Sequence, residues 1–196
     1  MDPPRYGTHG AEELGELTLP EGVRARVLAG SLGARSGPFA TVQPLQLIDY
    51  VLPPGASLLH EVPLELDNAM LYVHTGAGEL AAEGAGGHPM RTHTVARLDA
   101  SDASARSVRF TAGPAGASFL LMAGLRLRQP IAWHGPFVMT TDAEIRETLR
   151  EMQSGSFPPV RAAWDYRRLS AFPPELRARI EADEARVVAG EAQKRM

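Results

Sequence analysis

The sequence predicts an all-β domain, a sandwich or a small barrel, with one well-marked helix near its end. Nineteen glycines and sixteen prolines are spread between short apolar runs, which is typical of many turns between strands. Seven or eight such runs with turn residues between them indicate a sandwich or a small barrel. The strand candidates, in chain order, are residues 23–30, 45–52, 56–64, 69–76, 79–80, 91–99, 105–113 and 117–124.

Most of these candidates are separated by short stretches rich in glycine and proline. These stretches are PPG (53–55), GAG (76–78), GAGGHP (84–89) and GPAG (113–116). The run SFLLMAG (118–124) is apolar throughout, which predicts a strand that is covered on both faces. Residues 1–22 are rich in turn residues and are predicted to be irregular, with three leucines as anchors on the core: Leu14, Leu17 and Leu19.

Composition excludes several classes of protein. Lysine and arginine number 20 against 23 aspartates and glutamates, a net charge of −3, which argues against a nucleic-acid-binding surface built on bulk charge. The chain has no cysteine, so it can form neither a disulfide nor a thiolate zinc site, and a cytoplasmic location is expected. The start MDPPRYGTHG lacks the pattern of a signal peptide, and no apolar stretch approaches the ~20 residues that span a membrane.

The helix is predicted directly after residue 140. Thr141 and Glu144 form a capping-box pattern, and Gly155 is a natural end for the helix. Between them, apolar residues at positions i, i+4 and i+7 form one narrow stripe: Ile145, Leu149 and Met152.

The tail from Pro158 differs in character from the strands before it. Pro174 is well placed to begin a second helix that runs to about Val188. Its apolar stripe is thin among charged residues, and it consists of Leu176, Ile180 and Val187. Such a helix is weak alone and needs a surface to pack on, so residues 158–196 are interpreted as a helical appendage.

The stretch LLMAGLRLRQPIAWHGPFVMTTDAEIRETLREMQSGSF (120–157) resembles the C-terminal end of pirin-family proteins, where a Gly-Pro-Phe loop (Gly135, Pro136, Phe137) precedes a capped helix. GVRARVLAGSLGARSGP (22–38) resembles the first strand of the family's second barrel, and PRY (4–6) resembles the linker before that barrel. The resemblance covers residues 4–157, and no counterpart of the later tail is apparent.

Pirins are bicupins, so the resemblance implies a fold and a domain organisation. It implies a linker-like segment (1–22) and a cupin-like β-barrel or double-stranded β-helix that a C-terminal helix closes (23–157). The helical tail (158–196) follows as an appendage outside the resemblance. In the family, the N-terminal barrel holds one iron through three histidines and a glutamate, and some members oxidise flavonols such as quercetin. The C-terminal barrel usually holds no metal. Because the chain starts at the linker-like segment, the metal-bearing barrel is expected to be absent.

A cupin metal site needs two histidines at i and i+2 on one strand, because that spacing points both side chains into the barrel. The segment YVHTG (72–76) resembles the strand end that follows this pair and therefore sets the register. On this register the histidine positions fall on Val62 and Leu64, and the glutamate position falls on Asn68. None of the three can replace the expected ligand, so we expect no metal and no other cofactor.

A displaced metal site is the alternative. His60 and His74 have the same parity as Val62 and Leu64, so both could face inward if no bulge intervenes. They could join a nearby carboxylate such as Glu61, or His93, and bind iron or another divalent metal. On this alternative the chain would be a metal-dependent, quercetinase-like dioxygenase.

The sequence favours a non-catalytic role over this enzymatic alternative. A cupin barrel that lacks its usual companion would expose an apolar face unless a partner covers it. We therefore expect a binding or assembly module that forms a homodimer or joins a separately encoded, metal-bearing cupin barrel. A small apolar ligand in the barrel is a further expectation. Neither nucleic acid nor a membrane is an expected partner.

Overall fold

The computed structural model describes residues 8–82, 86–98 and 106–159. The chain divides into two compact units, and the larger one runs from residue 9 to residue 129. The described part of the smaller unit is residues 130–159. The predicted tail helix from Pro174 to about Val188 and the linker-like PRY segment lie outside the described residues.

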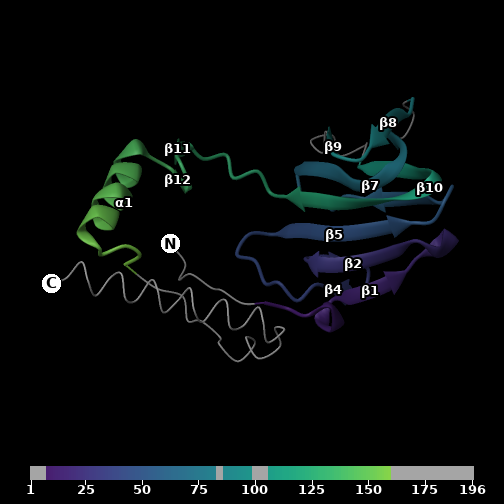
Figure 1. The fold of residues 1–196 in the computed structure, drawn as a ribbon, viewed down its shortest axis with the longest axis horizontal. Helices are drawn as coiled ribbons and strands as arrows, with labels where there is room; N and C mark the ends of the chain where they lie inside the picture. Colours follow the sequence, from purple (N-terminus) through teal and green to yellow (C-terminus); the bar gives the residue numbers. More distant parts are fainter. Residues whose placement is uncertain (1–7, 83–85, 99–105, 160–196) are drawn as a thin grey trace, which may run out of the picture. The chain divides into compact units, whose positions relative to one another are not determined.

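The larger unit is built on an eight-stranded antiparallel sheet (Figure 1), which confirms the all-β prediction. Its main path has the order β1-β2-β5-β10-β7-β8, while β6 pairs with β10 and β9 pairs with β7. The strands are β1 (Gly15–Thr18), β2 (Arg24–Ala29), β5 (Leu45–Leu52), β6 (Ser57–Glu61), β7 (Asn68–Ala82), β8 (His88–Arg91), β9 (Thr94–Leu98) and β10 (Ser107–Gly124). The short strands β3 (Ser31–Leu32) and β4 (Arg35–Ser36) form a separate hairpin, and two 3-10 turns, η1 (Ala11–Glu13) and η2 (Pro20–Gly22), flank β1.

Two pairs of predicted short strands are each one long strand. Residues 69–76 and 79–80 belong to β7, and 107–113 of the predicted strand 105–113 belong with 117–124 to β10, so the stretches GAG and GPAG are not chain reversals. Gly76 and Gly116 both have positive φ, at 75° and 78°, and the register of β7 and β10 shifts between Ala112 and Ala117. A side chain on Gly76 would collide with the carbonyl oxygen of Gly116. The glycines therefore bend two paired strands and bring them close together instead of reversing them.

The predicted irregular segment 1–22 contains a strand. Residues of β1 pair with β2, and Leu17 packs with Leu19 against the main core. Only four residues alternate here, with Glu16 and Thr18 exposed, and this run is too short to stand out in the sequence from turn-forming neighbours. The barrel sheet accordingly begins before residue 23.

Every second side chain along the strands points inward, and these side chains form the hydrophobic core. In β5, every second residue is buried, and in β2 the same pattern buries three residues of RARVLA. The largest fully buried side chains are Tyr50, Phe110, Phe119, Ile48, Leu71 and Leu121. β10 also alternates over residues 117–124, so Leu120 and Met122 are only half-buried. The prediction that this run is covered on both faces is therefore wrong, because one face of the sheet remains partly open to solvent.

The smaller unit contains a hairpin, β11 (Ala132–His134) and β12 (Phe137–Met139), followed by the predicted helix α1 (Asp142–Ser154). Gly135 and Pro136 form the turn of the hairpin, and the ring of Phe137 packs on Phe157 at 5.6 Å between centroids. The capping box is present, because Thr141 Oγ1 accepts the Glu144 N–H at 3.2 Å and the Glu144 carboxylate accepts the Thr141 N–H at 2.9 Å.

The buried face of α1 differs in part from the predicted stripe. Ile145 and Thr148 are buried, whereas Leu149 is half-buried and Met152 is 49% exposed. The helix packs on a hairpin whose strands have three residues each, so the packing surface ends before the last turn. Gly155 ends the helix in the left-handed conformation at φ 73°, as predicted. No described helix is long and apolar enough to span a membrane.

Candidate functional site

His60 lies in the interior of the larger unit. It is on β6, where alternation buries Leu58 and His60 and leaves Leu59 and Glu61 exposed. Its side chain has 4% exposure, and its Nδ1 atom lies 2.9 Å from the phenol oxygen of Tyr50. Tyr50 comes from β5, in which every second residue from Gln46 to Leu52 is buried. The two residues therefore form a buried polar pair between strands that are not neighbours in the sheet.

Aromatic rings and burial determine the electrostatics of this pair. Tyr50 packs on Phe119 at 5.2 Å between ring centroids, and Phe119 packs on Phe110 at 4.7 Å. Because burial disfavours the charged form, it lowers the pKa of His60 to about 4 and raises the pKa of Tyr50. Both side chains are therefore neutral at neutral pH, and a single hydrogen bond between them satisfies both facing atoms.

The second ring nitrogen of His60, Nε2, is buried and has no hydrogen-bond partner among the described residues. Such an atom loses its hydrogen bonds to water on folding and gains none in return, which costs about 1–3 kcal/mol. It is also the only imidazole nitrogen inside the sheet that could bind a metal, because His60 is the only one of the six histidines that is buried.

The described side chains do not supply a metal site around His60. Within residues 8–82, 86–98 and 106–159, no three His, Asp or Glu side chains are grouped so as to hold a metal ion. The buried polar or charged residues of this part of the chain are Gln46, His60 and Thr148, so no carboxylate reaches the interior. Glu61 follows His60 directly and points to the opposite side of β6.

His74 lies on the opposite face of the sheet from His60. Inward positions have even numbers in β6 (Leu58, His60) but odd numbers in β7 (Leu71, Val73). The turn from Val62 to Asp67 changes the parity, so the condition under which His60 and His74 could both face inward, an uninterrupted strand register, is not met. The parity of residue numbers predicts the face of the sheet on which a side chain lies only along a continuous extended strand.

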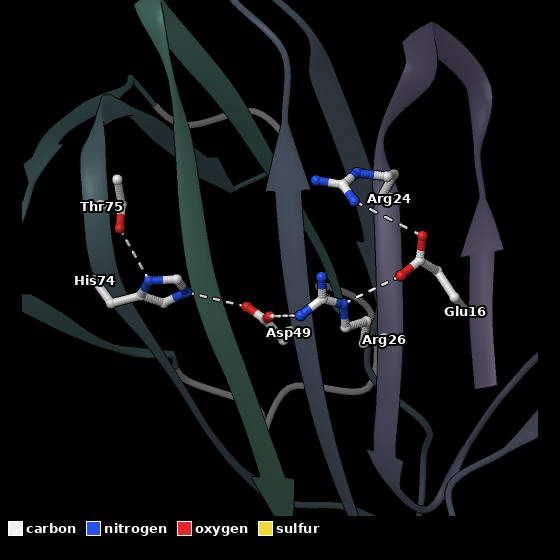
Figure 2. Close-up of polar contacts among 6 residues, drawn as sticks. All are labelled: Glu16, Arg24, Arg26, Asp49, His74 and Thr75. Atoms are coloured by element: carbon white, nitrogen blue, oxygen red, sulfur yellow. Dashed lines mark hydrogen bonds and ion pairs between the residues drawn. The ribbon is translucent and has the colours of Figure 1, made fainter. Parts of the chain in front are cut away.

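On the outer face, His74 takes part in a ladder of charged groups (Figure 2). Its Nε2 atom lies 3.0 Å from Asp49 on β5, across β10, which lies between the two strands in the sheet. Asp49 is also 4.0 Å from Arg26, and Arg26 donates to Glu16 at 3.1 Å. Arg24 lies 3.8 Å from the same glutamate. The ladder links four strands and engages the imidazole nitrogen of His74 that faces Asp49.

His93 is also on the surface. It occupies the turn between β8 and β9 with φ 67°, a conformation that is uncommon for residues other than glycine. Its Nδ1 atom lies 3.1 Å from the hydroxyl of Tyr72, which points away from the core. The structure therefore does not bring His93, His74 and His60 together with Glu61.

The three positions at which the sequence register places metal ligands lie in the turn that follows β6 or directly after it. Val62 is buried in a small satellite core, Leu64 is 71% exposed, and Asn68 begins β7. The guanidinium of Arg106 donates to the carbonyl oxygens of Val62, Pro63 and Leu66, which holds this turn in place. None of the three positions lies on a strand next to another ligand position.

Sequence reasoning did not identify Tyr50, which contacts His60, or Asp49, which contacts His74. The strand LQLIDYVL carries no clear signal, because Gln46 is buried while Leu45, Leu47 and Val51 are on the outer face, so the two faces differ in burial but not strictly in polarity. What no local pattern contains is the pairing across the sheet that brings each of them to a histidine.

Comparison with known proteins agrees with this architecture. The family model of the pirin C-terminal cupin domain matches residues 47–158. "Pirin-like protein 2" of Arabidopsis thaliana is 32% identical over 150 residues, which cover 74% of this chain and 46% of the relative. A "Pirin-like protein" of Solanum lycopersicum is 33% identical over 164 residues, covering 79% of this chain and 51% of the relative.

Among solved structures, a quercetin 2,3-dioxygenase from Acinetobacter baumannii superposes with a TM-score of 0.66 at 27% identity. The match covers 76% of this chain and 49% of that one. The chain thus spans about half the length of the relatives it matches, and the matched half is the C-terminal cupin domain. From its sequence, its β-rich fold and these matches, the chain belongs to the pirin family.

Proposed function

We propose that this pirin-family barrel is a metal-free, non-catalytic module that acts by binding another protein. The observation that carries the proposal is the His60–Tyr50 pair. The one imidazole inside the sheet faces a phenol and aromatic rings, and no described carboxylate or second histidine accompanies it. A cupin metal site requires several ligands that converge on one point.

The alternative is a metal-dependent dioxygenase, since the Acinetobacter relative is named a quercetin 2,3-dioxygenase. For this chain, such a site would need His74 to leave Asp49 and cross from the outer face of the sheet to the inner face. That movement would break the register of β7 and β10, which pair over most of their length. The geometry therefore favours the non-catalytic role.

Metal analysis tests the proposal. Tag-free protein produced in medium with iron, manganese and zinc should contain less than about a tenth of a metal ion per chain after gel filtration. His60→Phe and His74→Asn variants should have the same metal content as the natural sequence. A stoichiometric metal that disappears in His60→Phe would contradict the proposal, as would oxygen consumption with quercetin that the same substitution abolishes.

The binding role has its own support. One face of the chain's sheet has partly exposed apolar side chains, among them Val95, which is 60% exposed. We propose a homodimer as the first form of assembly, with a separately encoded, metal-bearing cupin barrel as the other partner to test. Size-exclusion chromatography with light scattering should give twice the chain mass. A small apolar ligand in the barrel would be detected by mass spectrometry of the small molecules that the protein releases when it is denatured.

A further inference from the structure

The hairpin β11–β12 of the smaller unit has one anchored face and one exposed face. Ala132 and Met139 are paired and share one face, and Ala132 is buried in the unit that α1 forms with the hairpin. Trp133 and Val138 are paired on the other face, because successive residues of a strand alternate. Trp133 is 76% exposed and Val138 is 58% exposed, and Ile131, directly before β11, is 76% exposed. These three residues are the hairpin patch.

Trp133 is held in this exposed position. Its indole N–H donates to the carbonyl oxygen of Gly135 in the turn, at 2.7 Å. The only polar atom of the side chain is therefore satisfied within the hairpin, and the ring offers an apolar surface. An aromatic side chain that is fixed before binding loses little conformational entropy on contact.

The helix α1 covers one face of the hairpin and not the other. It packs on both strands and buries Ile145 and Thr148 (Figure 1). A sheet with an apolar face is stable when another element covers that face. Within residues 130–159, the part of this unit that the structure describes, no element covers Trp133 and Val138.

The end of the described chain lies against this same hairpin. The N–H groups of Ser156 and Phe157 both donate to the carbonyl oxygen of Glu151, at 2.9 and 3.2 Å, and hold the chain at the end of α1. The ring of Phe157 then packs edge-on against Phe137 on β12, with 5.6 Å between the centroids. Phe157 is two residues before the end of the described chain, so the tail starts beside the strand that carries Val138.

The tail is long enough to reach the exposed face. At about 3.3 Å per residue, residues 160–173 can extend to about 45 Å, whereas each strand of the hairpin is only about 10 Å long. The helix that the sequence predicts over residues 174–188 would be about 22 Å long and would span the hairpin. Its one apolar stripe consists of Leu176, Ile180 and Val187.

Area favours an occupant that is tethered to the hairpin. With about 150–250 Å² for a large side chain, the exposed fractions give the hairpin patch on the order of 400 Å². A separate molecule that covered only this patch would bury roughly 800 Å² in total, which is below the area of a stable interface between proteins. A segment of the same chain needs less area, because a short tether raises its effective concentration to the millimolar range.

We infer that the tail helix, residues 174–188, packs its apolar stripe on the hairpin patch of its own chain. The hairpin would then lie between two helices, with α1 on one face and the tail helix on the other. A thin stripe of three apolar residues is too weak to hold an isolated helix, and the patch supplies the surface that it needs. This inference goes beyond the proposed binding role, because it assigns a function to the tail.

Engineered disulfides in the full-length protein test the contact, because the chain has no cysteine of its own. Val138→Cys is combined with one further substitution on the apolar stripe, in three double variants: Leu176→Cys, Ile180→Cys and Val187→Cys. The matched controls place the second cysteine on the opposite face of the predicted helix: Ala178→Cys, Ala182→Cys and Ala185→Cys. Because a disulfide needs its two Cβ atoms within about 4 Å, at least one stripe variant should form a disulfide within one chain several times faster than every control.

The fluorescence of Trp133 gives an independent measurement. The chain has two tryptophans, and Trp164→Phe leaves Trp133 as the only one. In this background, Ile180→Lys on the stripe should increase the quenching of Trp133 by acrylamide several-fold. Ala178→Lys adds the same charge on the opposite face of the helix and should leave the quenching unchanged. Circular dichroism and thermal melting confirm that each variant is folded.

Three results would each overturn the inference. Disulfides that join two chains would assign the hairpin patch to a second copy, and equal rates in stripe and control variants would show that the helix has no specific contact there. A Trp133 that acrylamide quenches equally with and without Ile180→Lys would show that the tail helix does not cover it. A metal-loaded enzyme would overturn only the proposed function and would leave this inference intact.

Discussion

The imidazole Nδ1 of His60 and the phenol oxygen of Tyr50 lie 2.9 Å apart in the interior of the barrel unit. Tyr50 is fully buried, His60 is nearly so, and rings and aliphatic side chains surround them. A pair of this kind makes each partner dependent on the other, because either one alone would be an unsatisfied polar group in an apolar core.

The first prediction concerns the energy of this pair. Tyr50→Phe should lower the free energy of unfolding by about 1–3 kcal/mol, because it leaves His60 Nδ1 without its partner. His60→Phe should cost less, because it leaves the Tyr50 hydroxyl without a partner but also removes the unsatisfied Nε2 atom. The double variant Tyr50→Phe/His60→Phe should lose clearly less than the sum of the two, since no orphaned group remains. Urea unfolding gives the three values, and additive losses would show that the hydrogen bond contributes nothing.

The second prediction concerns pH. The pKa of His60 is lowered to about 4 in the folded protein, against about 6.5 for a free histidine, so the unfolded chain binds a proton that the folded chain does not. The contribution of neutral His60 to the free energy of unfolding is fully present above pH 6.5. It decreases as the pH drops from 6.5 towards 4, by up to about 3 kcal/mol in total.

Urea unfolding at pH 7.5, 6 and 5 measures this slope. His60→Phe should remove it, apart from the contribution of the other titratable groups, while His74→Asn on the outer face should retain it. An unchanged slope in His60→Phe would mean that His60 is not buried as a neutral group.

The third prediction concerns the charged ladder on the outer face. Asp49→Asn removes the carboxylate that faces both His74 and Arg26. Because these groups are partly exposed, the free energy of unfolding should fall by no more than about 1 kcal/mol, and the loss should shrink in high salt. Glu65→Gln, an exposed carboxylate in the turn before β7, is the control and should change stability very little. A loss that salt does not reduce would assign Asp49 a role other than ion pairing.

The fourth prediction concerns the end of the barrel unit. The Asp67 carboxylate accepts the backbone N–H of Arg126 at 2.7 Å and also binds the guanidinium of Arg128. The Arg126 hydrogen bond is the main reason that the pKa of Asp67 is lowered. The contact ties the segment after β10 to the turn before β7, and Asp67→Ala should release it.

Limited trypsin digestion measures this release, because trypsin cleaves after both arginines. Asp67→Ala should be cut after Arg126 and Arg128 several times faster than the natural sequence, whereas Glu65→Ala should be cut at the natural rate. Equal rates in the two variants would show that the contact does not restrain the segment.

Local patterns were sufficient for part of the structure. The apolar run in residues 45–52 predicts β5 with its observed bounds, and the Thr141–Glu144 pattern predicts the start of α1 at the observed residue. The pirin resemblance in residues 120–157 predicts the family. In each of these cases the interactions that decide the outcome lie within a few residues of one another along the chain.

Other features depend on contacts between distant segments. GAG and GPAG read as turns, but Gly76 and Gly116 face each other in paired strands and let β7 and β10 continue. The turn after β6 changes the parity, and this places His74 on the outer face, away from His60.

The sequence by itself thus determined the strands that alternate cleanly, the capped helix and the family, because hydrogen bonds and burial along a single segment specify them. The tertiary structure alone decided which histidine lies inside and which partner it has. Those outcomes follow from the pairing of β5, β6, β7 and β10, whose residues meet only when distant parts of the chain form one sheet.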